Sequence, residues 1–141
     1  MLKNLHTRRY KIMKTQKLII KIDCSAQELF AFTMNPDNTP KWIDTITREQ
    51  TNERPTRLGT IYKHQNKEGK WLEYEITAFK ENEMFIMSLK DSTYHVKYTF
   101  MPIGPNSTEF EYFEWMDEGK LEVPFLQEGM QKLKAVLESK L

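Results

Sequence analysis

The sequence predicts an α+β domain, in which an antiparallel meander precedes one long C-terminal helix. Three observations indicate it: a capped helix broken by prolines follows the first apolar segment, a period of two persists from residue 46 to residue 116, and helical spacing returns only after residue 124. The predicted order is one strand, two short helices, about six further strands and one helix, which gives about seven strands in all.

The first strand is expected over residues 16–23, where apolar side chains occupy alternate positions. Ser25 and Glu28 follow it in the pattern S-x-x-E, a capping box in which each side chain satisfies a backbone amide at the start of a helix. Pro36 disfavours the helical conformation of the residue before it, so this helix should end near Met34. It is therefore about two turns long.

A second short helix is expected directly afterwards. Pro40 suits the first turn of a helix, because the amide hydrogen that proline lacks has no partner there. The predicted helix contains Trp42 and Ile43.

The meander contains six segments of alternating polarity, separated by stretches with Gly, Pro, Asn or Asp that are typical of turns. The predicted strands span residues 46–52, 60–66, 70–79, 84–90, 92–102 and 107–116. The closing helix has Pro124 in its first turn, and its expected buried stripe consists of Leu126, Met130, Leu133, Leu137 and Leu141.

Length and composition exclude several classes of protein. A chain of 141 residues fits one domain, and no apolar run approaches the roughly 20 residues needed to cross a bilayer. Cys24 is the only cysteine, which excludes an intramolecular disulfide and favours a reducing, cytoplasmic location. We expect no membrane insertion.

Residues 1–15 are interpreted as a basic N-terminal extension, and residues 16–141 as the single domain. Residues 1–22 carry seven Lys or Arg and no acid. This charge suits an arm for nucleic acid or an anionic surface, but Met13 could also be the natural start, with the preceding residues an upstream extension. We favour the second interpretation and expect no nucleic-acid partner.

Five segments resemble the START-like (SRPBCC, Bet v 1-like) superfamily, most closely its polyketide cyclase/dehydrase and lipid-transport branch: IDCSAQELFAFTMNPDNTPKW, RLGTIY, YEITAF, YHVKYTFMPIGPNSTEFEYFEW and LQEGMQKLKAVLESKL. The similarity covers residues 16–141, with one departure at residues 106–108, NST, where the family often has Gly-Thr. The resemblance implies the helix-grip fold, a curved sheet wrapped around the C-terminal helix with the two short helices plugging one side. It also implies a cavity between sheet and helix.

Alternation along the strands predicts which side chains would enter such a cavity. The inward set is aromatic and methionine-rich, with several polar groups, and a small ligand with a polar end would fit it. The predicted ligand-binding residues are Trp42, Tyr62, His64, Tyr74, Ile76, Phe85, Met87, Tyr98, Tyr112, Glu114, Met130 and Leu133.

Glu114 and His64 are the candidate catalytic residues. A carboxyl group on an otherwise apolar face could act as a general acid or base, with His64 as its partner. Alternatively, a bulge near the strand end would turn Glu114 to solvent. The neighbouring acidic residues lie along one strand and do not converge, and the three histidines lack metal-ligand spacing, so we expect neither a metal nor a cofactor.

The primary functional prediction is binding or carrying of a small hydrophobic ligand. The sequence lacks the nucleophile, zinc-protease and phosphate-loop motifs, G-x-S-x-G and H-E-x-x-H among them. Two alternatives remain: an enzyme of the cyclase or dehydratase type that uses pocket acid and base groups, and a protein-interaction module. The sequence does not indicate an oligomeric state.

Overall fold

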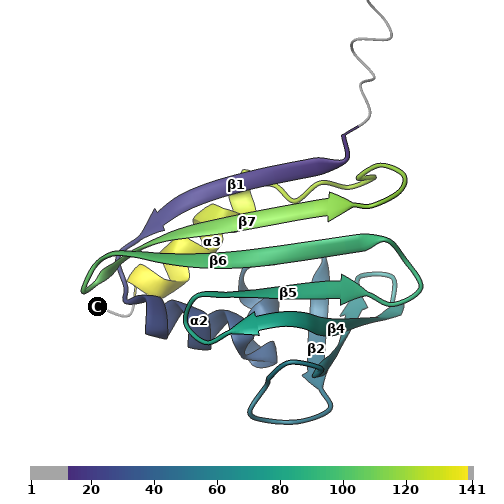
Figure 1. Ribbon diagram of the computed structural model, residues 1–141, viewed down its shortest axis with the longest axis horizontal. Helices are drawn as coiled ribbons and strands as arrows, with labels where there is room; N and C mark the ends of the chain where they lie inside the picture. Colours follow the sequence, from purple (N-terminus) through teal and green to yellow (C-terminus); the bar gives the residue numbers. More distant parts are fainter. Residues whose placement is uncertain (1–12, 140–141) are drawn as a thin grey trace, which may run out of the picture.

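A computed structural model describes residues 13–139 of the chain and shows a helix-grip fold. Seven antiparallel strands form one sheet in the order β1-β7-β6-β5-β4-β3-β2 (Figure 1). The elements are β1 (Thr15–Ile22), α2 (Ala26–Met34), the 3-10 helix η1 (Pro36–Lys41), β2 (Ile46–Thr51), β3 (Ile61–Asn66), β4 (Trp71–Lys80), β5 (Met84–Leu89), β6 (Tyr94–Gly104), β7 (Ser107–Met116) and α3 (Gln127–Glu138).

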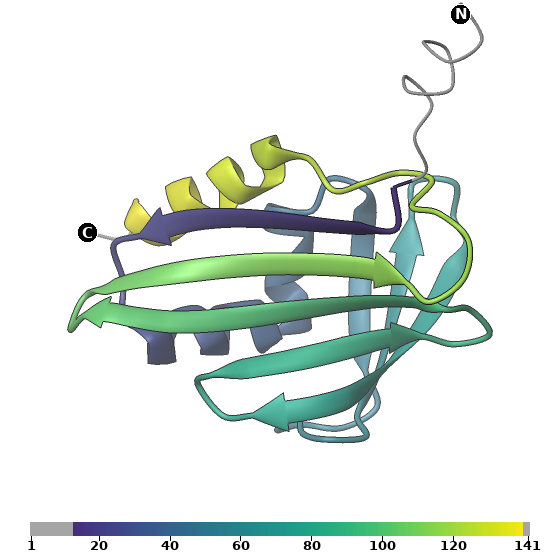
Figure 2. The same ribbon diagram turned by 45° about the horizontal axis from the view of Figure 1, so that its top comes forward.

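The sheet is strongly curved. Figure 2 shows β2 and β3 running steeply across the direction of β1 and β7, with the helices gathered on the concave side. Three register shifts interrupt the ladders, in β2 after Ile46, in β4 after Ile76 and in β6 after Pro102. Such irregularities bend a strand and increase its twist, which lets one sheet enclose the helices.

The first helix follows the prediction. The Glu28 amide donates to Ser25 Oγ over 3.1 Å, and α2 ends at Met34. Its Phe30 ring packs edge-on against Phe85 and Phe100, with centroid distances of 5.9 and 5.2 Å. The predicted plugging of one side of the sheet is therefore present, and this aromatic cluster fills the core beneath α2.

The second short helix lies earlier than predicted. It spans Pro36–Lys41 as a 3-10 helix, and Trp42 follows it as the C-cap. Asn35 explains the difference, because its Oδ1 accepts the Asp37 amide over 3.0 Å and caps a turn that already begins at Pro36. Pro40 lies inside the helix, and Trp42 still points into the core, where it is 1% exposed.

Helix α3 is shorter than predicted and lies against β1 on the concave face (Figure 1). It begins at Gln127, because Leu126 is extended with φ −98° and ψ 148°. Leu126 consequently leaves the predicted buried stripe and is 64% exposed. Met130, Leu133 and Leu137 are buried as predicted, and Leu141 lies outside the described residues.

The first strand begins one residue earlier than predicted, and the division of the chain into an extension and a domain stays a prediction. Strand β1 begins at Thr15, and the carbonyls of Met13 and Lys14 accept the amides of Leu121 and Met116. Residues 1–12, which carry most of the predicted extension, lie outside the described part of the chain. Within residues 13–139, no helix has the length and hydropathy needed to cross a bilayer.

Candidate functional site

A pocket of about 780 Å³ lies on the concave side of the sheet. Strands β3 to β7 supply its floor, including Met87 and Val96. The η1–β2 segment and the loop 117–126, together with the start of α3, supply the remaining walls. The pocket thus occupies the part of the concave face that the aromatic cluster under α2 leaves unfilled.

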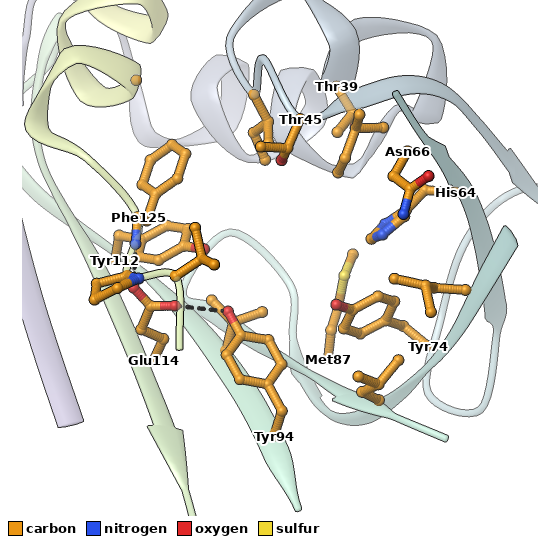
Figure 3. A pocket seen from close by; sticks show the side chains of 18 of the residues that line it. Thr39, Thr45, His64, Asn66, Tyr74, Met87, Tyr94, Tyr112, Glu114 and Phe125 are labelled. Carbon is orange, nitrogen blue, oxygen red and sulfur yellow. Dashed lines mark hydrogen bonds between the residues drawn. The ribbon is translucent and has the colours of Figure 1, made fainter. Parts of the chain in front are cut away.

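Seven of the predicted ligand-binding residues line this pocket. They are Trp42, His64, Tyr74, Met87, Tyr98, Tyr112 and Glu114. The close-up view shows Glu114 on one side and His64 on the opposite side (Figure 3). These two candidate catalytic residues are both buried, but each has a different partner.

The other five predicted residues lie in the packed core and not in the lining. They are Tyr62, Ile76, Phe85, Met130 and Leu133. Alternation correctly places them on the inner face but does not tell where a helix covers that face. Tyr62, for example, donates its hydroxyl proton to the Met34 carbonyl at the end of α2 over 2.6 Å, which makes it a structural contact between sheet and helix.

Glu114 is 2% exposed and accepts three hydrogen bonds. Its Oε2 accepts from Gln16 Nε2 and from the Phe125 amide, each over 2.7 Å, and its Oε1 accepts from the Tyr94 hydroxyl over 2.8 Å. All three partners are donors, so the carboxyl group acts as an acceptor throughout. No bulge turns it to solvent, and Glu114 joins β1, β6 and the approach to α3.

Aromatic rings form the wall beside Glu114. Phe125 stacks on Tyr112 with a centroid distance of 4.4 Å, and Trp42 meets both rings edge-on. A Cβ atom at Gly129 would overlap the Phe125 ring, so the absence of a side chain there lets the ring pack against the first turn of α3. The loop 117–126 is therefore fixed at its end by both a hydrogen bond and ring packing.

A second buried polar group lies on the opposite wall. Glu49 lines the pocket with a side chain that is 4% exposed. Its Oε1 accepts the Thr39 hydroxyl over 2.6 Å, and its Oε2 lies 3.9 Å from His64 Nδ1, which is beyond hydrogen-bond distance. Burial raises the pKa of Glu49 to about 7 and lowers the pKa of His64 to about 4.

Sequence reasoning missed Glu49 because a bulge changes the parity of β2. Without it, the pairing of Ile46 with Asn66 would place Arg48 opposite His64. The register shift between Ile46 and Arg48 instead pairs Glu49 with His64, and directly opposed residues share a face of the sheet. Only the unusual polarity of β2, whose one consistently buried residue is Ile46, hinted at an irregular strand.

Two tyrosine hydroxyls in the lining make no hydrogen bond to any described residue, those of Tyr74 and Tyr98. Burial raises the pKa of both hydroxyls well above their ordinary value, so they remain protonated donors. Tyr74 also packs against His64, with ring centroids 4.9 Å apart. The pocket floor, to which β4 and β6 contribute these tyrosines, therefore carries donors that a ligand can use.

A third polar cluster lies on the outer face of the sheet, away from the pocket. Ser88 Oγ is 2.7 Å from His95 Nδ1, and His95 Nε2 is 2.7 Å from Asp117 Oδ2. Trp115 stacks on the His95 ring and donates to Asp117 over 3.2 Å. The three groups are linked in the order of a Ser-His-Asp catalytic triad, but none of them lines the pocket. Strand β5, which carries Ser88, lies between β4 and β6, and pairing with these strands occupies its backbone amides, so they cannot form an oxyanion hole. We interpret the cluster as a brace that holds the end of β7.

The described residues contain no group of three or more His, Cys, Asp or Glu side chains that could hold a metal ion. The interior of the site is built from aromatic and aliphatic side chains, the two buried carboxyl groups of Glu49 and Glu114, and several hydroxyls. Such a lining suits a mostly apolar organic molecule held by a few hydrogen bonds.

Comparison with protein families shows to which family the chain belongs. Residues 14–139 match the family described as polyketide cyclase / dehydrase and lipid transport. The chain belongs to this family. The description of this family and the helix-grip fold together indicate a START-type domain for hydrophobic ligands.

Solved structures support the fold. XoxI from Bacillus cereus superposes with a TM-score of 0.72 at 12% identity, covering 91% of this chain and 98% of that one. A START superfamily protein from Mycobacterium smegmatis gives 0.71 at 17% identity, with 91% and 99% covered. Norcoclaurine synthase from Thalictrum flavum, in complex with dopamine and hydroxybenzaldehyde, gives 0.55 at 10% identity, with 78% and 72% covered. No curated protein matched the sequence.

Proposed function

We propose that this chain binds or carries a small, mostly hydrophobic molecule with a polar group, within the pocket between the curved sheet and α3. The observation that carries the proposal is a pocket of about 780 Å³ whose lining is largely apolar but includes the unpaired hydroxyls of Tyr74 and Tyr98 in the described structure. This volume lies within the range of small-molecule sites, roughly 300–1,000 Å³. The single cysteine favours action in the cytoplasm.

An aromatic ligand suits the walls best. Trp42, Tyr98, Tyr112 and Phe125 present ring faces and edges that pack well against another ring. The family description includes polyketide cyclases, and the structure of norcoclaurine synthase contains two small aromatic molecules, dopamine and hydroxybenzaldehyde. Both observations support a ligand of this class.

The entrance lies at the loop 117–126. Val123 and Leu126 line the pocket but are 81% and 64% exposed, whereas Leu121 between the strand end and these residues is buried. Lys67 and Lys120 also belong to the lining. We infer that a ligand enters past this apolar rim, which shields it from water during transfer.

Titration with the neutral fluorophore N-phenyl-1-naphthylamine tests binding. We expect saturable fluorescence enhancement, and native mass spectrometry of the protein purified from cells should show a copurified small molecule. Leu72→Trp, which fills the floor next to His64, should weaken binding at least tenfold. Thr99→Trp, on the outer face of β6, is the matched control and should not. Equal loss in both variants, or no saturable binding by the wild type, would exclude the pocket as the binding site.

A further inference from the structure

We propose that Glu49 is a catalytic acid–base group of the pocket, and that the ligand is a small carbon acid, a molecule with a C–H bond next to a carbonyl or comparable electron-withdrawing group. This inference rests on the proposed function, since it requires a ligand in the same pocket. It gives a catalytic role to Glu49, which alternation along the strands did not predict as a site residue.

The position of Glu49 suits proton transfer. One carboxyl oxygen, Oε1, is oriented by the Thr39 hydroxyl at 2.6 Å. The other, Oε2, accepts no hydrogen bond from the described residues, and His64 Nδ1 lies 3.9 Å from it, beyond hydrogen-bond distance. A carboxyl group held by one oxygen and unoccupied at the other can approach a ligand atom without breaking an existing hydrogen bond.

Glu114 does not have this property. Its two oxygens already accept from Gln16, Tyr94 and Phe125, and these hydrogen bonds hold the pocket wall together. A proton transfer at Glu114 would disturb all three. The two buried carboxyl groups of the pocket therefore divide into a structural one and a reactive one.

The protonation of Glu49 agrees with its geometry. Because burial raises its pKa to about 7, both the acid and the base form are populated at neutral pH, as acid–base catalysis requires. The titratable groups that face it are His64 and Tyr62 on β3, Tyr74 on β4 and Tyr98 on β6. Burial keeps His64 uncharged and the tyrosines protonated near neutral pH, so the titration of Glu49 dominates there.

Two tyrosines of the pocket floor can stabilise the product of proton removal. When Glu49 takes a proton from the C–H bond, the electron pair of that bond forms a carbon–carbon double bond and the carbonyl oxygen becomes an enolate oxygen. Tyr74 and Tyr98 supply hydroxyl donors without other described partners for that oxygen. Glu49 then returns the proton to another atom of the same molecule, which gives an isomer and requires no cofactor.

The test uses 5-nitrobenzisoxazole, a small aromatic carbon acid whose ring opening needs only a base. The base removes the ring proton, the C–H electron pair completes the nitrile triple bond, and the N–O bond breaks to release a coloured phenolate. We expect the wild type to accelerate this reaction over buffer, with a rate that rises with pH around a midpoint near 7, the value to which burial raises the pKa of Glu49. Because His64 is already neutral at pH 5, a reaction that depended on His64 would not follow this profile.

Variants separate the roles. Glu49→Gln should lose the acceleration by at least about tenfold, since a general base contributes roughly 10²–10⁴-fold. Glu49→Asp should restore part of it with the same sigmoidal pH profile. Glu111→Gln, a carboxylate of β7 whose strand position points it to the outer face, is the control and should retain full activity.

Binding of N-phenyl-1-naphthylamine is measured for every variant. Binding without acceleration, or acceleration that persists in Glu49→Gln, would overturn the catalytic role and leave the binding function standing. If the wild type neither binds the fluorophore nor accelerates the reaction, the proposed function itself is overturned.

Discussion

Glu49 lies opposite His64 across the β2–β3 ladder, and a one-residue register shift places it there. The pair faces the pocket with opposite titration behaviour, because burial disfavours the charged form of each group. Between about pH 4 and pH 7 the pair holds a neutral acid beside a neutral imidazole. This arrangement gives a prediction for stability as well as for chemistry.

Glu49→Gln should change the pH dependence of unfolding. In the folded state Glu49 keeps its proton up to about pH 7, whereas its ordinary pKa of 4.5 applies to the unfolded chain. Its contribution to stability is therefore fully present below pH 4.5 and is lost as the pH rises through 7. The free energy of unfolding of Glu49→Gln, minus that of the wild type, should thus increase by up to about 3 kcal/mol over this interval.

Urea denaturation between pH 4.5 and 8 measures this difference. His64 contributes in the opposite direction, but it is present in both proteins and largely cancels. A difference that does not vary with pH would show that Glu49 titrates as an exposed carboxyl group.

Glu114→Gln should destabilise the protein by about 1–3 kcal/mol, because one oxygen and one amide cannot accept all three hydrogen bonds. Hydrogen exchange should show faster exchange in the loop 117–126, whose Phe125 amide loses its acceptor. Glu111→Gln on the outer face should change stability by less than about 0.5 kcal/mol. Equal effects of the two changes would argue against the anchoring role.

Tyr62→Phe and Tyr74→Phe should have contrasting effects. Removal of the Tyr62 hydroxyl leaves the buried Met34 carbonyl without its partner and should cost about 1–3 kcal/mol of stability, with fluorophore binding unchanged. Removal of the Tyr74 hydroxyl should leave the free energy of unfolding within about 0.5 kcal/mol of the wild-type value but weaken the binding of ligands that have a carbonyl group. Thermal unfolding and ligand titration distinguish them, and the reverse pattern would place Tyr62 in the site.

Gly129→Ala should displace the Phe125 ring, because the added Cβ would occupy its position. We expect destabilisation of about 1–3 kcal/mol from overpacking and a change in the fluorescence of Trp42, whose ring meets Phe125 edge-on. Ala substitution at Gly104, where a Cβ would meet only Ser107 at 3.7 Å, is the control. A neutral Gly129→Ala would show that the ring is free to move.

His95→Gln should weaken the outer brace by about 1–2 kcal/mol through the loss of its contacts with Ser88 and Asp117. Ser88 should not react with a fluorophosphonate, because the brace lies outside the pocket and offers no site for an acyl group. Mass spectrometry of the treated protein checks this. Covalent labelling that disappears in Ser88→Ala would contradict the structural interpretation.

Periodicity was sufficient for most of the fold. The capping box at Ser25 and Glu28, the six alternating segments and the stripe of Met130, Leu133 and Leu137 each reflect local rules, and the structure shows them where they were predicted. Leu126 was wrongly predicted to be buried, because the apolar spacing of the helix continues in the sequence into a residue whose backbone is extended. Pattern alone does not mark that boundary.

The candidate site was predictable only in part. Alternation identifies inner-face residues such as Tyr74 and Glu114, but it gives no depth along the strand, so Tyr62 could not be distinguished from them. Glu49 depended on a bulge that reverses parity, and the polarity of β2 indicates an irregular strand without showing where the bulge lies. The hydrogen-bond partners of Glu114, such as Gln16 and Phe125, come from distant parts of the chain, so only the structure could identify them.

The central claim is that the space between the sheet and α3 holds a ligand, and methyl NMR of the methionines tests it most directly. Met87 and Met116 line the pocket, whereas Met34, the last residue of α2, is buried in the core and Met101 is exposed on β6. Saturation with N-phenyl-1-naphthylamine should shift the Met87 and Met116 methyl resonances and leave those of Met34 and Met101 in place. Shifts confined to Met101, or unchanged resonances at Met87 and Met116 under saturating fluorophore, would contradict the account.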